Sequence, residues 1–435
     1  MPIFVLDDDP TGSQTVHSCP LLLRWDRATL AAGMASGAPL LFLLTNSRSL
    51  SPQAAVARAR EVCAAMRGLE PYPTVVVSRS DSTLRGHFPL EPQVIEAELG
   101  PFDRFFLVPA FLEGDRLTRH GIHGIRQPDG GFVPVGETEF ARDPAFPFRS
   151  SDLRDYLAEK TGGAVTLASV CHLSRSELRE PNLLARLVAL PRGSWVTADA
   201  EEQADLDALA GVIRALADQG YRSLLRCAAS LLTSLAQLPT QPLPPTEMHR
   251  LCGPGPGLVL VGSWVERTTE QLNELLTEPG LAPLELRVSD LLADPEAETE
   301  RLRQAIAAAH RRGLTAVVAT SRERISLADP SADLALGQRI ARALGDLVQA
   351  CGPDLGFIVA KGGVTANTLL AESLGVARVD LQGQIAPGVN LVRLPADHGR
   401  WPGLPVVTFP GNVGDRRTLA AVLARLRPGG GVFPT

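Results

Sequence analysis

Short apolar runs alternate with polar loops and helix-like segments along this chain of 435 residues. The first run covers residues 3–6, is too short for a helix, and is soon followed by Pro10 and Gly12, which predicts a buried strand. Similar runs lie at residues 20–23, 40–44, 75–77 and 105–108. After the third run, Ser51 is placed as an N-cap and Pro52 as the first helical residue. This alternation predicts a mostly parallel sheet with helices on its faces.

The pattern is weaker in the next part of the chain. Residues 109–150 show little periodicity and are predicted as a long loop, of a kind that is often functional. We interpret His120 and His123 as loop histidines, since no acidic or cysteine partner stands at a recognised metal-ligand spacing. Further on, we expect helices at 150–159, 175–190, 202–219 and 222–236, and short strands near 165–168 and 194–197.

Proline and glycine concentrate between residues 238 and 257, which is a linker composition. We therefore predict one domain over residues 1–237 and a second over 258–435. In the second, apolar runs near 258–261, 284–288, 315–319, 355–360 and 406–409 again alternate with predicted helices. The predicted fold class is α/β, with two doubly wound, mostly parallel-sheet domains and an interdomain cleft.

Composition and charge narrow the classes of function that this chain can have. The formal net charge is −6 and no basic run is present, which disfavours nucleic-acid binding. No apolar stretch reaches the roughly 18 residues of a membrane span, so no membrane association is expected. The six cysteines are scattered without a CxxC pair, which is typical of a reducing cytoplasm.

The loop after the first strand holds three consecutive carboxylates, Asp7, Asp8 and Asp9, followed by Thr11 and Gly12. Unpaired buried carboxylates are costly, so the loop is expected at the carboxyl edge of the sheet, where ligands bind in open α/β folds. These charges need a metal, an arginine or substrate hydroxyls nearby. A simpler interpretation is a turn with solvated aspartates.

Two further strands end in polar loops that a parallel sheet would bring to the same edge. The first contains Arg48, and the second contains Arg79, Asp81, Ser82 and Arg85. Arginines are suited to a carboxylate and aspartates to hydroxyls, so this mixture of charges indicates a polyhydroxy acid as ligand. The alternative is a solvated helix N-terminus with a local ion pair.

Three glycine turns follow apolar runs of the second domain: Gly262-Ser263, Lys361-Gly362-Gly363 and Gly411-Asn412-Val413-Gly414. Free backbone N–H groups at such turns favour a polyphosphate, and a lysine adds a point charge. Neither GxxxxGK[ST] nor GxGxxG is present, which argues against a P-loop or an ordinary NAD fingerprint. Helix-entry turns that need a positive φ are the alternative.

These motifs resemble those of the four-carbon acid sugar kinases, a family with an N-terminal sugar-acid-binding domain and a C-terminal nucleotide-binding domain. In the first domain the resemblance rests on Asp7-Asp8-Asp9-Pro10-Thr11-Gly12 and on Arg79-x-Asp81-Ser82-Thr83-Leu84-Arg85-Gly86. In the second domain it rests on Gly362-Gly363-x-Thr365, Gly383-x-x-x-x-Pro387-Gly388 and Gly411-Asn412-x-Gly414. The chain departs from the family at Val364, where many members have aspartate.

The resemblance implies ATP-dependent phosphorylation of a hydroxyl on a small sugar acid such as threonate or erythronate. Its sugar-acid site would comprise Asp7, Asp8, Thr11, Gly12, Arg48, Arg79, Asp81, Ser82 and Arg85. Within it, the arginines would hold the carboxylate, and Asp8 or Asp81 would orient and deprotonate the hydroxyl. ATP would bind Gly262, Ser263, Lys361, Gly362, Gly363, Thr365, Gly388, Gly411, Asn412 and Gly414. Mg²⁺ would bridge its phosphates.

Two other functions stay open at this stage. The order Asp7-x-Asp9-x-Thr11 also matches the nucleophile motif of haloacid-dehalogenase-like phosphatases, although the later lysine and acidic cluster of that group are missing. A two-domain protein that senses sugar acids without turning them over is the second. The sequence also leaves a homodimer open.

Overall fold

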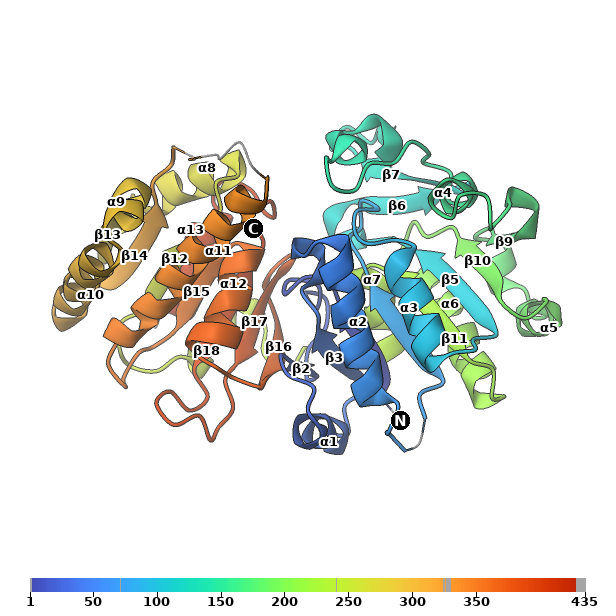
Figure 1. Cartoon of the computed structure of the whole chain (residues 1–435), viewed down its shortest axis with the longest axis horizontal. Helices are drawn as coiled ribbons and strands as arrows, with labels where there is room; N and C mark the ends of the chain where they lie inside the picture. The colour runs from blue at the N-terminus through green and yellow to red at the C-terminus, as the bar shows by residue number, and fades with distance from the viewer. Residues whose placement is uncertain (1, 71, 240, 324, 326–329, 428–435) are drawn as a thin grey trace. The chain divides into compact units, whose positions relative to one another are not determined.

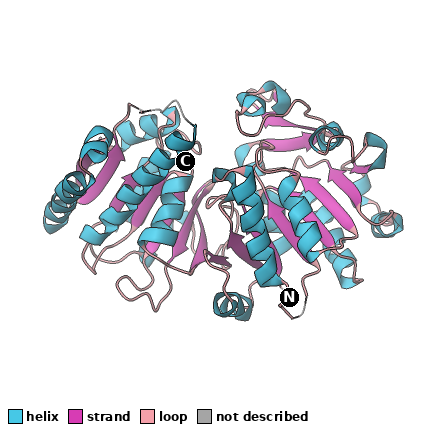
Figure 2. Ribbon diagram, in the orientation of Figure 1, coloured by secondary structure: helices cyan, strands magenta, loops and turns pink. Residues whose placement is uncertain are grey.

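A computed structural model describes residues 2–70, 72–239, 241–323, 325 and 330–427. The chain divides into two compact units, Met1–Pro239 and Thr240–Thr435. Each unit has helices on both faces of a mostly parallel sheet, so the predicted α/β class is confirmed in both (Figures 1 and 2). Residues 428–435, the end of the predicted second domain, lie outside the described residues.

The sheet of the first unit is parallel throughout and runs in the order β2-β3-β1-β4-β11-β5-β10-β9. Its central strands are apolar and buried on both faces, as parallel strands covered by helices should be. The strands are β1 (Ile3–Asp7), β2 (Pro20–Leu22), β3 (Leu40–Leu44), β4 (Val75–Arg79), β5 (Arg104–Val108), β9 (Val170–Leu173), β10 (Ser194–Ala198) and β11 (Ser223–Cys227).

Helices cover both faces of this sheet. Residues of α1 (Arg27–Ala35), α2 (Pro52–Met66) and α3 (Leu90–Leu99) share one apolar cluster with side chains of the sheet. The helices α6 (Gln203–Asp218) and α7 (Ala229–Ala236) lie behind the sheet in the view of Figure 1. The predicted N-cap of α2 is confirmed, because the hydroxyl of Ser51 accepts a hydrogen bond from the backbone N–H of Ala54. Peripheral helices are α4 (Leu153–Lys160) and α5 (Leu183–Ala189).

Four predictions in this unit are wrong. Residues 222–236 form the strand β11 followed by α7 rather than one helix, because pairing with β4 and β5 buries Leu224 and Leu225. Residues 175–190 hold only a short 3-10 turn and α5, and the strand expected near 165–168 is β9, a few residues later. The expected loop 109–150 contains an antiparallel sheet of β6 (Arg116–Arg119), β7 (Ile122–Arg126) and β8 (Phe132–Pro134).

The sheet of the second unit runs in the order β13-β14-β12-β15-β18-β17-β16. It is parallel as far as β18, and β16 and β17 form an antiparallel hairpin that the sequence analysis did not predict. The strands are β12 (Leu258–Val261), β13 (Leu281–Leu286), β14 (Thr315–Thr320), β15 (Ile358–Lys361), β16 (Arg378–Ala386), β17 (Val389–Arg393) and β18 (Pro405–Phe409).

One face of this second sheet packs against α8 (Glu266–Leu275) and α13 (Thr418–Leu426) in a single apolar cluster. The other helices are α9 (Val288–Ala293), α10 (Pro295–Arg311), α11 (Pro330–Asp346) and the short α12 (Gly363–Thr368). Asp294 caps α10, because its carboxylate accepts a hydrogen bond from the backbone N–H of Ala297. In the described part of the chain, none of the helices combines the length and the apolar character needed to cross a bilayer.

Candidate functional site

Asp7 is the last residue of β1, which lies between β3 and β4 in the first sheet. It lies in register with Leu44 of β3 and Arg79 of β4, so the carboxyl ends of three parallel strands meet at this point. The carbonyl of Asp7 accepts hydrogen bonds from the backbone N–H and the hydroxyl of Thr45, each at 2.9 Å. The predicted gathering of the polar loops at one sheet edge is therefore present.

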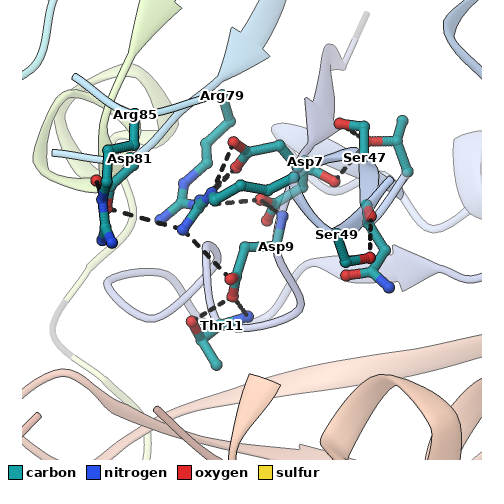
Figure 3. A network of polar contacts seen from close by, with 12 residues as sticks. Asp7, Asp9, Thr11, Ser47, Ser49, Arg79, Asp81 and Arg85 are labelled. Carbon is teal, nitrogen blue, oxygen red and sulfur yellow. Dashed lines mark hydrogen bonds and ion pairs between the residues drawn. The ribbon is translucent and has the colours of Figure 1, made fainter. Parts of the chain in front are cut away.

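Asp8 is the centre of a buried ion cluster at this edge. Arg48 donates two hydrogen bonds to its carboxylate, from Nε at 3.0 Å and from Nη2 at 2.6 Å. Arg79 donates a third from Nη1, also at 3.0 Å. Its side chain reaches from β4 toward Asp7 (Figure 3). Burial opposes ionisation of Asp8, but the charges of Arg48 and Arg79 outweigh it and lower the pKa of this carboxyl. Asp8 is therefore a stable carboxylate.

Asp7 is held differently from Asp8, although the two are adjacent. Its side chain is fully buried, its Oδ1 lies 3.4 Å from Nη1 of Arg79, and its Oδ2 has no hydrogen-bond partner among the described residues. Burial raises the pKa of Asp7 to about 7, and Arg79 offsets this only in part. Gly12 covers the carboxylate, since a Cβ at Gly12 would lie 2.1 Å from Oδ1 of Asp7.

Asp81 begins the loop after β4 and is fixed by that loop. It accepts hydrogen bonds from the backbone N–H and the hydroxyl of Thr83, and from Nε of Arg85 at 2.8 Å. Burial disfavours its charge, but Arg48, whose Nη1 lies 3.7 Å from Oδ1, and Arg85 hold the pKa of Asp81 well below its usual range. Two ionised carboxylates, those of Asp8 and Asp81, thus flank one arginine.

The remaining predicted residues of the first unit lie around this cluster. Thr11 donates its hydroxyl and its N–H to Asp9, which in turn lies 3.3 Å from Nη1 of Arg48. The carbonyl of Ser82 is hydrogen-bonded by Nε2 of His123 at 2.7 Å. The structure therefore brings together all the predicted sugar-acid residues: Asp7, Asp8, Thr11, Gly12, Arg48, Arg79, Asp81, Ser82 and Arg85. Each of the three arginines, however, is already paired with an aspartate.

A second layer behind the cluster was missed by the sequence analysis. Arg226 of β11 donates from Nη1 to Glu91 at 2.8 Å and to the hydroxyl of Ser78 at 2.7 Å, all of them buried. Ser47 bonds the other oxygen of Glu91, which ties this pair to the loop that carries Arg48. The sequence analysis predicted one helix over residues 222–236, so it did not indicate that Arg226 lies in a strand, in register with Ser78 of β4.

In the second unit, the predicted glycine turns also meet at one sheet edge. Lys361 of β15 lies in register with Val261 of β12 and Phe409 of β18. The N–H of Gly262 donates to the carbonyl of Lys361 at 3.1 Å, and that of Gly362 donates to Phe409 at 2.8 Å. The ends of three parallel strands are thereby joined directly to one another.

The turns pack so closely that side chains are excluded. A Cβ at Gly262 would lie 2.2 Å from Oγ1 of Thr365, and one at Gly411 would lie 2.7 Å from Oγ of Ser263. Gly362 has a φ of +122°, which other residues rarely adopt. Backbone without side chains therefore lies beside the first turn of α12, where helical N–H groups lack intrahelical acceptors.

Lys361 occupies an unexpected position for a predicted phosphate ligand. Its side chain is fully buried, Nζ donates to the carbonyl of Pro410 at 2.5 Å, and the ammonium lies 3.7 Å from the ring centroid of Phe409. Burial, with a smaller contribution from the charge of Arg267, lowers the pKa of Lys361 to about 7. The lysine supports the Pro410–Gly411 turn from beneath.

The remaining predicted nucleotide residues lie at the same edge. Asn412 and Gly414 are exposed, and their turn is held by Gln271, whose amide donates to the carbonyl of Val413 at 3.0 Å. Gly388, with a φ of +69°, forms the turn of the β16–β17 hairpin. Because Asn390 pairs with Thr408, that turn lies beside the carboxyl end of β18.

Comparison with known proteins assigns both units. Residues 3–235 match a family described as the sugar-binding N-terminal domain, and residues 258–419 match a nucleotide-binding C-terminal domain. The first match alone spans more than half of the chain. The acidic loop and arginines thus lie in the sugar-binding unit, and the glycine turns lie in the nucleotide-binding unit.

Two characterised enzymes are similar in sequence. D-threonate kinase of Salmonella typhimurium is 27% identical over 451 residues, which cover 97% of this chain and 98% of that enzyme. D-erythronate kinase of Heliobacterium modesticaldum is 31% identical over 174 residues, a match that spans only 39% of this chain and 37% of that enzyme. A solved structure from Haemophilus influenzae covers 98% of this chain and all of its own, with a TM-score of 0.63 at 17% identity. That structure shows the fold alone.

Proposed function

Because this chain belongs to the four-carbon acid sugar kinase family, we propose that it transfers the terminal phosphoryl group of ATP to a hydroxyl of a small sugar acid. Threonate and erythronate are the proposed acceptors, as they are for the two similar enzymes. One observation carries the proposal. The unit that matches a sugar-binding domain has buried carboxylates at its sheet edge, and the unit that matches a nucleotide-binding domain has bare glycine turns at its own.

In this proposal, Asp8 and Asp81 orient the acceptor hydroxyl. Arginines hold both as carboxylates of lowered pKa, so each is a good hydrogen-bond acceptor and a weak base. A weak base suffices, because phosphoryl transfer passes through a loose transition state in which positioning and charge neutralisation do most of the catalysis. The ion cluster with Arg48 and Arg79 fixes the position of Asp8 before the substrate arrives.

The glycine turns are proposed to hold the ATP phosphates. The N–H groups at the first turn of α12, including that of Gly363, would bind phosphate oxygens. The hydroxyl of Ser263, which lies beside Gly411, would add a side-chain donor. Lys361 would contribute through the position of the Pro410 turn rather than by direct contact.

Magnesium is proposed to enter with ATP. The described residues contain no group of three or more acidic, histidine or cysteine side chains that could hold a metal. Mg²⁺ commonly keeps several waters and takes one or two protein oxygens besides the phosphates, so the hydroxyls of Ser263 and Thr365 fit it. When bound, the ion would neutralise charge on the transferring phosphoryl group.

The test is ADP formation by the full chain with ATP and Mg²⁺ against a panel of three- to six-carbon sugar acids. We expect acceptor-dependent ADP release with threonate or erythronate, and a product heavier by one phosphoryl group in mass spectrometry. Asp81→Asn is the matched inactive control, because it keeps the shape of the side chain and removes its charge.

Two outcomes would replace the proposal. Phosphate release from a phosphomonoester without ATP, lost in Asp7→Asn, would indicate the phosphatase. Stabilisation by a sugar acid, with no turnover and no effect of ATP, would indicate a sensing protein. The burial of Asp7 beneath Gly12 argues against the first, since a phosphoenzyme needs an accessible nucleophile.

A further inference from the structure

The ion cluster of the sugar-binding unit offers no free cation for the carboxylate of an acid substrate. Arg48, Arg79 and Arg85 each form ion pairs with aspartates of the same loops. Five aspartates, at positions 7, 8, 9, 81 and 143, form ion pairs with these three arginines. An anionic substrate therefore needs a positive group from elsewhere in the unit.

Arg116, the first residue of β6, is such a group. Its Nη1 donates to the carbonyl of Gly114 at 2.6 Å, while its Nε is buried and finds no hydrogen-bond partner among the residues that the structure describes. No carboxylate among the described residues lies within ion-pair distance of it. The side chain is half-buried and so still reachable from solvent. Arg116 thus carries a charge that forms no ion pair within the described part of the chain.

The strand β6 directs Arg116 toward the proposed substrate site. Thr118 lies two residues further on, so its side chain shares the face of β6 that carries Arg116. The Thr118 hydroxyl lies 3.0 Å from Nδ1 of His123, and Nε2 of the same ring lies 2.7 Å from the carbonyl of Ser82. Ser82 directly follows Asp81, so this face lies against the loop that carries Asp81 and Arg85. In keeping with this, Asp81 acts to raise the pKa of Arg116, which burial lowers.

The guanidinium of Arg116 is also held in place before any ligand binds. Arg116 and Phe111 exchange two backbone hydrogen bonds, each of 2.9 Å, which close a tight turn. A Cβ at Gly114 would lie 2.2 Å from Nη1, so the glycine makes room for the guanidinium. The turn is fastened to α7 by the hydroxyl of Ser230, which accepts from the N–H of Leu112 at 2.9 Å.

We propose that Arg116 binds the carboxylate of the sugar acid and so selects acids over the corresponding neutral polyols. The inference rests on the proposed function and revises the roles at the site. The carboxylates of Asp8 and Asp81 take hydroxyls, and Arg48, Arg79 and Arg85 keep these carboxylates charged and in place. A planar guanidinium with free donors can bind a carboxylate through two parallel hydrogen bonds.

The experiment compares wild type, Arg116→Gln and Arg116→Lys with erythronate and threonate, and with the neutral polyols erythritol and threitol. Binding is followed by calorimetry and turnover by ADP release. Loss of a hydrogen-bonded ion pair should raise KM and Kd for the acid about 10- to 100-fold in Arg116→Gln. Arg116→Lys should recover only part of this loss, because an ammonium keeps the charge without the fork. KM for ATP and the binding of the polyols should not change.

Arg119→Gln is the matched control. It removes an arginine from the same strand, but one that faces the other way and pairs with Glu201 at 2.6 Å. Two results would overturn the inference: Arg116→Gln binds the sugar acid as tightly as wild type does, or it loses affinity equally for acids and polyols. In either case, turnover by wild type would still uphold the kinase. Acid binding that depends on Arg116 without any ADP release would overturn the kinase and uphold the carboxylate contact. Absence of acid binding in wild type would overturn both.

Discussion

A methyl group added at Gly12 would lie 2.1 Å from Oδ1 of Asp7 and 2.6 Å from Cζ of Arg79. Both neighbours are buried, and neither is a flexible end that can swing into solvent. We therefore expect Gly12→Ala to move the acidic loop off the ion pair of Asp7 and Arg79, lowering stability by about 1–3 kcal/mol through overpacking. The same shift should abolish most sugar-acid turnover.

Denaturant unfolding and ADP release would check this prediction. Gly68→Ala is a suitable control, because a methyl group at Gly68 meets nothing within 4 Å. If Gly12→Ala behaved like Gly68→Ala in both measurements, the close cover over Asp7 would have no role in forming the site.

Replacing Asp8 should be more damaging than its single charge suggests. Its side chain is 2% exposed and bonds both Arg48 and Arg79, so Asp8→Asn leaves two guanidinium groups near each other without their shared partner. Breaking a buried pair from one side typically costs about 3–5 kcal/mol. Turnover should also fall steeply, because the proposed orienting carboxylate is gone.

The comparison for Asp8 is an exposed ion pair of similar length. Arg342 and Glu372 lie 2.6 Å apart with side chains 64% and 46% exposed, so Glu372→Gln should cost no more than about 1 kcal/mol. A double-mutant cycle with Arg48→Met and Asp8→Asn would measure the coupling directly. A coupling energy near zero would contradict the buried cluster.

The position of the cluster could be predicted from sequence because strand ends in a parallel sheet share an edge. Asp7, the loop of Arg48 and the loop of Arg79 follow three separate apolar runs, and their meeting needs only the parallel arrangement. The pairing within the cluster could not be predicted. It depends on side-chain burial, which turns Arg48 and Arg79 into partners of Asp8 rather than open forks.

Other misses have different physical causes. Arg226 was hidden because Ser223–Cys227 followed by Ala229–Ala236 has no turn signal, and the strand forms only through its neighbours β4 and β5. The β16–β17 hairpin did have a signal, since residues alternate between buried and partly exposed from Arg378 to Ile385 and Pro387-Gly388 marks the turn. Lys361 was predicted as a point charge for phosphate from its place beside two glycines, but its buried ammonium bonds the carbonyl of Pro410.

The raised pKa of Asp7 predicts a pH dependence of stability. Its native value of about 7 exceeds the ordinary value of 3.8, so the native state binds the proton more tightly than the unfolded chain does. The contribution of Asp7 to the free energy of unfolding is therefore lost as pH rises from about 4 through about 7. Asp7→Asn cannot ionise, so its unfolding free energy relative to wild type should rise over this range and level off above it.

Urea unfolding of both proteins at half-unit pH steps would test this dependence. Using the difference between the two removes the contribution of other titrating groups. A difference that stayed constant from pH 4 to 8, or that fell, would contradict the raised pKa that burial gives the Asp7 carboxyl.

The buried Lys361 should make stability depend on pH with the opposite sign. Burial lowers its pKa from 10.5 to about 7, so the unfolded chain binds this proton more tightly than the native state does. The contribution of Lys361 to the free energy of unfolding therefore rises as pH increases from about 7 to about 10. Lys361→Met keeps the contact of the side chain with the Phe409 ring but removes the ammonium and its bond to the Pro410 carbonyl. The variant should therefore be most stable relative to wild type near pH 7 and lose that advantage toward pH 10.

At pH 7.5 Lys361→Met should also bind ATP more weakly, because the Pro410–Gly411 turn is no longer held by the lysine. Unfolding free energies and ATP titrations at both pH values would check this, with Lys160→Met as the control, since Lys160 is only half-buried and bonds the Pro147 carbonyl in the other unit. Unchanged ATP affinity in Lys361→Met would show that the buried lysine does not position the turn.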